Sequence, residues 1–167
     1  MKPKSIKFSL DDSSLEEDYR LIAIYSNEED YRMAFLLNYH FNMHFAKAKS
    51  ILQNKTSAAF NVYEYEDKNH YRNWILLHNY YLTQHVQVQS GGLFANMETV
   101  IEKPLFYIKE LSKARFLLKI EADETPAFFE SFIQKLKTIS QIYTAELVDL
   151  QTVKKRELLK FWVTYWT

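Results

Sequence analysis

Glycine is almost absent from this chain of 167 residues, where it occurs only at the adjacent positions Gly91 and Gly92. Loops that cradle phosphate groups need several spaced glycines, because backbone amides must approach the ligand closely there. Two adjacent glycines cannot form the GxGxxG, GxxxxGK or GxSxG patterns. The sequence therefore excludes a recognisable Rossmann dinucleotide site, Walker nucleotide site or nucleophile elbow.

Charge and cysteine content narrow the function classes further. The 21 basic and 21 acidic residues give a formal net charge of zero, so no global field concentrates nucleic acid or anionic lipid. Cysteine is absent, which excludes disulfides, thiolate metal sites and cysteine nucleophiles. The sequence also lacks the apolar run of a signal peptide or a membrane helix. We therefore expect a cytoplasmic protein with no membrane partner, for which nucleic acid is a disfavoured partner.

Hydrophobic periodicity predicts several strands. Alternating or continuous apolar runs, rich in β-branched and aromatic residues, are typical of strands. The expected strands are residues 4–10, 21–25, 58–66, 71–82, 114–120 and 142–148. The polar stretch between the third and the fourth of them indicates a β-hairpin. Phe116 and Leu118 are expected to face the core, and they alternate with Arg115 and Lys119.

Two principal helices are also expected. The first covers about residues 27–41, with Ser26 and Glu29 at the spacing of a capping box. Its predicted core-facing stripe is Tyr31, Ala34, Phe35, Asn38 and Phe41. The second helix follows Thr125, an N-cap residue before a first-turn proline. Residues from Val153 onward indicate a further helical segment at the C-terminal end.

Together these elements predict a single α+β domain over residues 1–167. It consists of a mainly antiparallel sheet of about five to seven strands, two principal helices packed on the sheet, and a C-terminal helical segment. Four stretches are expected to lack regular structure: the ends at 1–4 and 163–167, an acidic loop at 11–18 and an irregular segment at 83–106.

Several segments line up with a known protein family. The run Asp30, Tyr31 and Arg32 resembles its DYR pattern, and residues 60–67, FNVYEYED, are similar to its aromatic hairpin strand. Residues 108–116 have the spacing of the motif that names the IPExxxVDY family. Over about residues 5–162, the chain therefore resembles a divergent member of that family.

The motif itself is only partly kept. Ile108 and Glu110 match it, whereas its proline, valine, aspartate and tyrosine are replaced by Lys109, Ala114, Arg115 and Phe116. The resemblance implies a small bacterial cytoplasmic protein and carries over no catalytic residue. We expect Glu110 to have a local structural role.

Histidine spacing offers a weak metal signal. His40 and His44 are four residues apart, which on a continuous helix would place two imidazoles on one face. The glutamate of an HExxH motif is missing, since Phe41 follows His40. Asn42 tolerates the left-handed conformation that ends a helix, so the two rings are expected to diverge. We expect no metal, no cofactor and no catalytic residue.

The remaining candidates are contacts for a ligand or partner. A cation at the start of the first helix, the partly kept motif and the basic, aromatic C-terminal segment supply them. They are Arg32, Glu110, Arg115, Lys154, Lys155, Arg156 and Trp162. The C-terminal segment is interpreted as packing on its own domain, forming a dimer, or binding nucleic acid or membrane.

These observations favour a non-enzymatic binding or scaffolding protein that acts through protein–protein contacts, with itself as a homodimer or with another cytoplasmic protein. The high aromatic content supports a dimer, because 27 aromatic residues, 12 Tyr, 12 Phe and 3 Trp, are many for one small domain to cover. Two alternatives stay open. One is an enzyme with a site of scattered Asp, Glu, His and Tyr residues, and the other is an RNA-associated protein with exposed aromatic platforms.

Overall fold

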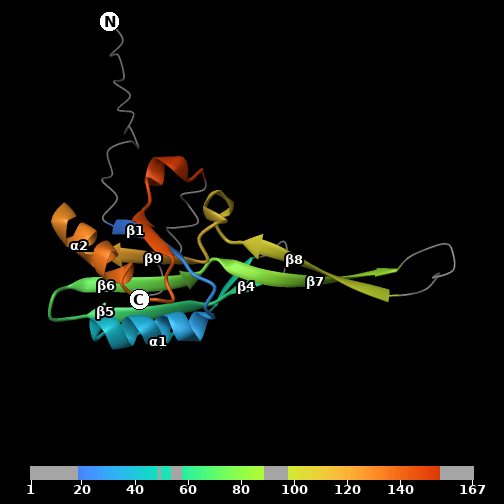
Figure 1. Cartoon of the computed structure of the whole chain (residues 1–167), viewed down its shortest axis with the longest axis horizontal. Helices are drawn as coiled ribbons and strands as arrows, with labels where there is room; N and C mark the ends of the chain where they lie inside the picture. Colours follow the sequence, from blue (N-terminus) through green and yellow to red (C-terminus); the bar gives the residue numbers. More distant parts are fainter. Residues whose placement is uncertain (1–18, 49, 54–57, 89–97, 155–167) are drawn as a thin grey trace, which may run out of the picture.

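A computed structural model describes residues 19–48, 50–53, 58–88 and 98–154 (Figure 1). In chain order the elements are β1 (Tyr19–Tyr25), α1 (Asp30–Phe41), β2 (Ala46–Lys47), β3 (Ile51–Gln53), β4 (Ala58–Phe60), β5 (Val62–Asp67), β6 (Arg72–His78), β7 (Tyr80–Val88), β8 (Glu98–Phe106), the 3-10 turn η1 (Lys109–Leu111), β9 (Phe116–Glu121), α2 (Pro126–Leu136), β10 (Thr144–Leu147) and the 3-10 turn η2 (Leu150–Thr152). The predicted strand at 4–10, the acidic loop at 11–18, the frayed ends and most of the C-terminal helical segment lie outside the described residues.

Six strands form the main sheet, in the order β10-β1-β9-β6-β5-β2, and each neighbouring pair is antiparallel. Two small antiparallel pairs, β3 with β4 and β7 with β8, complete the strands of the described chain. Two helices and a mainly antiparallel sheet make this an α+β fold, as the sequence predicts.

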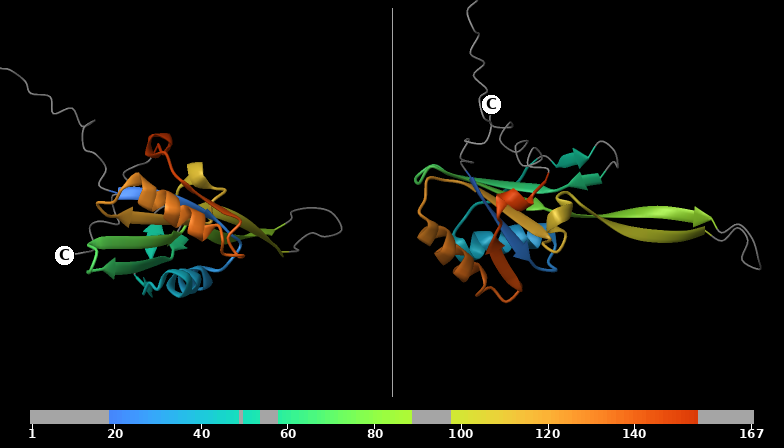
Figure 2. Two further views of the ribbon diagram at one scale, coloured as in Figure 1. Left: turned by 60° about the vertical axis from the view of Figure 1, so that its left-hand side comes forward. Right: turned by 90° about the horizontal axis from the view of Figure 1, so that it is seen from above.

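Both helices pack on one face of the main sheet (Figure 2). The helix α2 is close to the prediction, since the Thr125 side chain accepts a hydrogen bond from the Phe128 amide and Pro126 opens the helix. Its buried residues are Phe129, Phe132, Ile133 and Leu136. They join side chains of β1, β5, β6, β9 and β10 in one apolar core.

The opposite face of the sheet is also covered. There β4, η1 and the region around η2 pack on β1, β6 and β9 and form a second apolar core. Its buried members include Phe60, Ile108 and Ala114. The central strands therefore have no solvent face, which is why β1 is a nearly continuous apolar run.

The predicted core stripe of α1 is correct at Ala34, which is buried, and at Phe41, which packs against the core, but it is wrong at Tyr31 and Phe35. Tyr31 and Phe35 are 61% and 64% exposed. The buried side chains are those of Met33, Ala34, Leu36 and Leu37. The helix carries an aliphatic row and an aromatic row on different sides. The aliphatic row packs on the sheet, and the aromatic row faces outward.

The predicted capping box is wrong as well. Glu29 is the N-cap residue of α1, and its side chain makes no capping hydrogen bond. Ser26 instead donates to the carbonyl of Gln141 (2.7 Å) and accepts from the amide of Glu28 (3.1 Å). The hydroxyl therefore joins the end of β1 to the loop before β10.

The predicted irregular segment at 83–106 is largely regular. Residues up to Val88 and from Glu98 belong to β7 and β8, which pair from Tyr80↔Phe106 to Val88↔Glu98. The sequence does not indicate these two strands, because polar residues alternate with apolar ones in both of them and β8 contains Pro104. Proline disfavours a paired strand unless the strand lies on an edge. The predicted strand at 71–82 is divided at Asn79 into β6 and β7.

Within the described ranges, no helix has the length and apolar character needed to span a bilayer.

Candidate functional site

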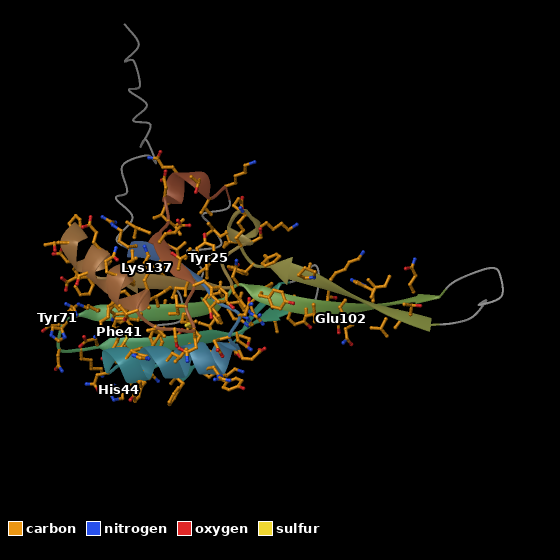
Figure 3. The ribbon with its side chains drawn as sticks, in the orientation of Figure 1. Tyr25, Phe41, His44, Tyr71, Glu102 and Lys137 are labelled. Carbon is orange, nitrogen blue, oxygen red and sulfur yellow. The ribbon has the colours of Figure 1, made fainter. Side chains whose placement is uncertain are left out.

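The hairpin of β7 and β8 forms an arm that projects from the body of the domain (Figure 1). Among the described strands, neither β7 nor β8 pairs with any strand other than its partner in the arm. Glu102 lies well out along this arm, whereas Phe41 and His44 mark the body (Figure 3). A two-stranded ribbon is marginally stable on its own in water, so the arm is the part of this fold that gains most from a further contact.

One face of the arm presents apolar side chains to solvent. Leu82, Val86 and Val100 are 40%, 60% and 55% exposed. Val86 lies opposite Val100, and Leu82 lies opposite the exposed Pro104. Between these two pairs the Gln84 amide donates to the Glu102 carboxylate (3.0 Å). The result is an apolar face with a polar pair at its centre.

Asn79 fixes the elbow from which the arm leaves the sheet. Its side chain is fully buried, and its Oδ1 accepts from the Ile108 amide at 2.8 Å. Its Nδ2 lies within hydrogen-bond distance of the carbonyls of Ile108 (3.4 Å), Leu111 (3.1 Å) and Ala114 (3.1 Å). Its backbone amide donates to the carbonyl of Arg115 (2.8 Å). The Asn79 side chain therefore holds residues 108 to 114, in the connection between β8 and β9.

Arg115 joins the base of the arm to the start of α1. Its guanidinium lies 4.6 Å from the centre of the Tyr80 ring, and Nε donates to Nε2 of His78 (3.2 Å). Its other nitrogens reach the Asn27 carbonyl (3.4 Å) and the Glu29 carboxylate (3.6 Å). A planar, always charged group with several donors is suited to such a junction.

His78 is an uncharged member of this junction. Its ring stacks on Phe116, with centroids 5.0 Å apart, and is almost fully buried. Burial lowers the pKa of His78 to about 4, the Arg115 cation also lowers it, and Asp30 opposes them. Because Arg115 donates to Nε2, that nitrogen carries no proton and acts as the acceptor.

Asp30 anchors the first turn of α1 to β5. Its carboxylate accepts from Nδ2 of Asn61 (2.8 Å) and from the Tyr63 hydroxyl (3.1 Å). Burial and this carboxylate raise the pKa of Tyr63 to about 12. Ser50 donates in turn to Oδ1 of Asn61 (2.8 Å). Each of these groups is engaged by another side chain, so the arrangement suits a structural network better than proton transfer to a substrate.

The other predicted contact residues are dispersed. Arg32 is exposed and forms an ion pair with Glu28 (3.0 Å) one turn earlier. Glu110 lies exposed on η1, and Lys154 is exposed after η2. Lys155, Arg156 and Trp162 lie outside the described residues. Of the described candidates, only Arg115 belongs to the junction at the base of the arm.

His40 and His44 do not share a helix face. The helix α1 ends at Phe41, and Asn42 takes the left-handed conformation (φ 53°, ψ 44°) that the sequence predicts. The His40 ring contacts Tyr39, whereas the His44 ring contacts Tyr65 on β5. In the described part of the chain, no three His, Asp or Glu side chains gather in a way that could hold a metal ion.

Lys119 is a buried cation that the sequence does not reveal. The predicted alternation implies a solvent face for it, but the side chain is 0% exposed. Its Nζ contacts Oε1 of Glu121 (2.6 Å) and lies 4.5 Å from the centre of the Tyr19 ring. The prediction is wrong because the second face of the sheet is covered too. The ammonium is retained there by a carboxylate and an aromatic face.

Sequence reasoning missed Asn79 as well. A signal was present, since His78 and Asn79 are polar residues in the middle of the apolar run from Trp74 to Leu82. A buried polar side chain needs partners, and such an interruption indicates a site where the backbone leaves the regular ladder. The exposed aromatic row of α1, with Phe35 stacked on Tyr39 at 6.2 Å, gives no such signal.

Comparison of the chain with protein-family models, curated proteins and solved structures finds no match. The resemblance to the IPExxxVDY family therefore stays a prediction.

Proposed function

We propose that the protein is a non-enzymatic binding protein that acts in the cytoplasm as a homodimer, with the arm β7–β8 as its contact element. The observation that carries this proposal is the exposed apolar face of the arm. Leu82, Val86 and Val100 lie together on a ribbon that leaves the body of the domain (Figure 1). The absence of cysteine supports a reducing compartment.

A second copy is the partner that the chemistry of this face favours. The face is apolar at both ends and polar at its centre, where Gln84 meets Glu102. If the arm is turned end for end, each apolar end of the face takes the place of the other, and the polar centre keeps its position. A twofold axis produces such a reversal, so the face is complementary to itself.

The rival functions find less support in the described residues. The buried or half-buried polar groups at the base of the arm, such as His78, Arg115 and Asp30, are already engaged within the chain. The exposed aromatic row of α1 begins beside Glu28, Glu29 and Asp30, which repel a phosphate backbone. Both observations favour a protein contact over catalysis or RNA binding.

Light scattering after size exclusion tests the proposal. We expect a mass about twice the chain mass of 20.0 kDa. In a double variant, Val86→Lys and Val100→Glu place opposite charges on one cross-strand pair of the apolar face. We expect it to raise the dissociation constant at least about tenfold, because apolar contacts between copies are lost.

A matched control carries the same two charges on the opposite face of the arm. Gln87 and Thr99 are the neighbouring cross-strand pair, and both are exposed. The control variant Gln87→Lys with Thr99→Glu is expected to remain dimeric. A wild-type mass near 20.0 kDa at every workable concentration would contradict the proposed function.

A further inference from the structure

The outer edge of β7 is open in the described structure, and the hydrogen bonds at the elbow show which of its groups point outward. The Tyr107 amide donates to the Asn79 carbonyl (3.1 Å), one step before the pair Tyr80↔Phe106. Bonded and non-bonded pairs alternate in an antiparallel ladder, so the odd-numbered residues of β7 bond to β8. The even-numbered residues Leu82, Gln84 and Val86 direct their N–H and C=O groups toward the outer edge.

The two edges of the arm differ in their capacity to pair. On β8, Pro104 occupies an outward-directed position opposite Leu82 and has no N–H to donate. Proline and lysine are common protections of an edge strand, and Lys103 stands beside this proline. From Leu82 to Val86, β7 has no proline and all its outward amides are intact.

At the base of the arm β4 packs beside β7, where the rings of Phe60 and Tyr81 lie 6.1 Å apart. The open edge therefore begins beyond Tyr81.

We infer that two copies of the chain pair antiparallel through the outer edges of β7, with Gln84 on the twofold axis, and so form a four-stranded ribbon from the two arms. This inference rests on the proposed function and specifies its geometry. In this register Gln84 faces its own counterpart, and Leu82 of each copy faces Val86 of the other. About six main-chain hydrogen bonds join the copies.

The side chains fit this register. Across the ribbon, each outer row reads Pro104 and Leu82 of one copy, then Val86 and Val100 of the other. The central row consists of Glu102 and Gln84 from each copy, so the two amides separate the two carboxylates. Apolar residues meet apolar residues, and both outermost strands are the proline-bearing β8. Pairing through β8 would instead leave a complete edge open on β7.

Two proline variants test which edge is used. Gln84→Pro removes an outward amide from β7, and Glu102→Pro removes the matching one from β8. Because the two residues form a non-bonded pair, neither change breaks a main-chain hydrogen bond within the arm. Both changes remove the same side-chain hydrogen bond between Gln84 and Glu102, so the two variants are matched in this respect. We expect Gln84→Pro to raise the dimer dissociation constant at least a hundredfold and Glu102→Pro to change it less than threefold, as measured by sedimentation equilibrium.

Single cysteines test the register, because the natural chain has none. Two Gln84→Cys chains would place their Cα atoms about 5.5 Å apart across the axis, within the range of a disulfide. Two Glu102→Cys chains would be separated by three strand spacings, about 14 Å, which is too far. We expect oxidised Gln84→Cys to run as a covalent dimer and Glu102→Cys to remain uncrosslinked.

The failures of the two proposals can be told apart. A wild-type dimer that survives Gln84→Pro, or that crosslinks through Glu102→Cys in preference to Gln84→Cys, would overturn edge pairing and leave the dimer in place. A monomeric wild type would overturn the dimeric function and the pairing with it. Circular dichroism of both proline variants must match the wild type, and the cysteine pair gives the answer independently if one of them does not fold.

Discussion

The two faces of the main sheet are both buried, yet they are held by different forces. The face beneath α1 and α2 is a continuous apolar core in which Phe116 and Trp74 are central. The opposite face mixes apolar side chains with the buried polar residues Asn79 and Lys119, each with dedicated partners. Apolar packing is non-directional, whereas hydrogen bonds and ion pairs require one geometry. The helical face therefore supplies bulk stability, and the opposite face fixes how the connections and the arm leave the sheet.

The largest loss of stability is expected from a substitution on the face of the sheet that α1 and α2 cover. Phe116→Ala removes a fully buried ring from the core and leaves a cavity, so the free energy of unfolding should fall by about 3–5 kcal/mol. Glu110→Ala, at an exposed position of the same motif region, should cost about 1 kcal/mol or less. Urea denaturation of both variants measures the difference. A larger loss for Glu110→Ala would make that residue functional or structurally central.

On the opposite face, Asn79→Ala should cost about 3 kcal/mol. The change leaves the buried Ile108 amide and several carbonyls without their partner. Asn73→Ala is the control, because this half-buried amide makes a single long contact with Glu121 (3.4 Å). It should cost less than about 1 kcal/mol. Equal losses in the two variants would show that the elbow does not depend on the Asn79 side chain.

The buried ion pair of Lys119 and Glu121 allows a test in which the more conservative substitution is expected to lower the stability more. Glu121→Gln keeps the shape but leaves the fully buried Lys119 ammonium without its carboxylate, and should cost about 2 kcal/mol. Lys119→Met removes the charge and keeps the length, and should cost about 1 kcal/mol or less. The double variant should resemble Lys119→Met alone. If Lys119→Met proves the more damaging change in thermal and urea unfolding, the ion pair itself stabilises this face.

A smaller, pH-dependent effect is expected at His78, where the two faces meet at the arm. The pKa of His78 is about 4 in the folded chain and about 6.5 when unfolded, so protonation favours the unfolded state. This stability is complete above about pH 6.5 and is lost as the pH falls toward 4. At pH 5 the wild type should have lost about 1–2 kcal/mol relative to pH 7.

A His78→Gln variant isolates this contribution. Glutamine does not titrate and can still accept a hydrogen bond from Arg115. The loss between pH 7 and pH 5 should therefore be smaller in His78→Gln by that amount. Parallel pH dependences of the two proteins would mean that His78 is not held neutral at this junction.

Sequence patterns predicted the parts of the fold that depend on local signals. Thr125 and Pro126 mark the start of α2, Asn42 marks the end of α1, and the apolar run of β1 indicates a strand covered on both faces. These signals act within a few residues, so no tertiary information is needed. The class and the antiparallel character of the sheet follow from them.

The predictions that were wrong concern residues whose burial depends on which other elements cover them. Lys119 is buried because the second face of the sheet is covered, and Phe35 is exposed because Leu36 and Leu37 take the place on the sheet. Neither outcome is encoded in the spacing of the residues themselves. The candidate arm was missed for a related reason, since β7 and β8 mix polar and apolar residues and β8 contains Pro104, so neither strand shows a clean apolar run.

The position of β1 in the sheet has a consequence for the order of events during synthesis. This first described strand lies between β9 and β10, and its partners are distant in sequence, as in Ile24↔Phe116 and Ile22↔Leu147. A ribosome releases the chain from the N-terminus, so β1 emerges long before either partner exists. The local hairpin of β5 and β6 can close early, because its strands are joined by a short turn. During synthesis the apolar strand β1 therefore lacks both of its sheet neighbours until β9 and β10 have left the ribosome.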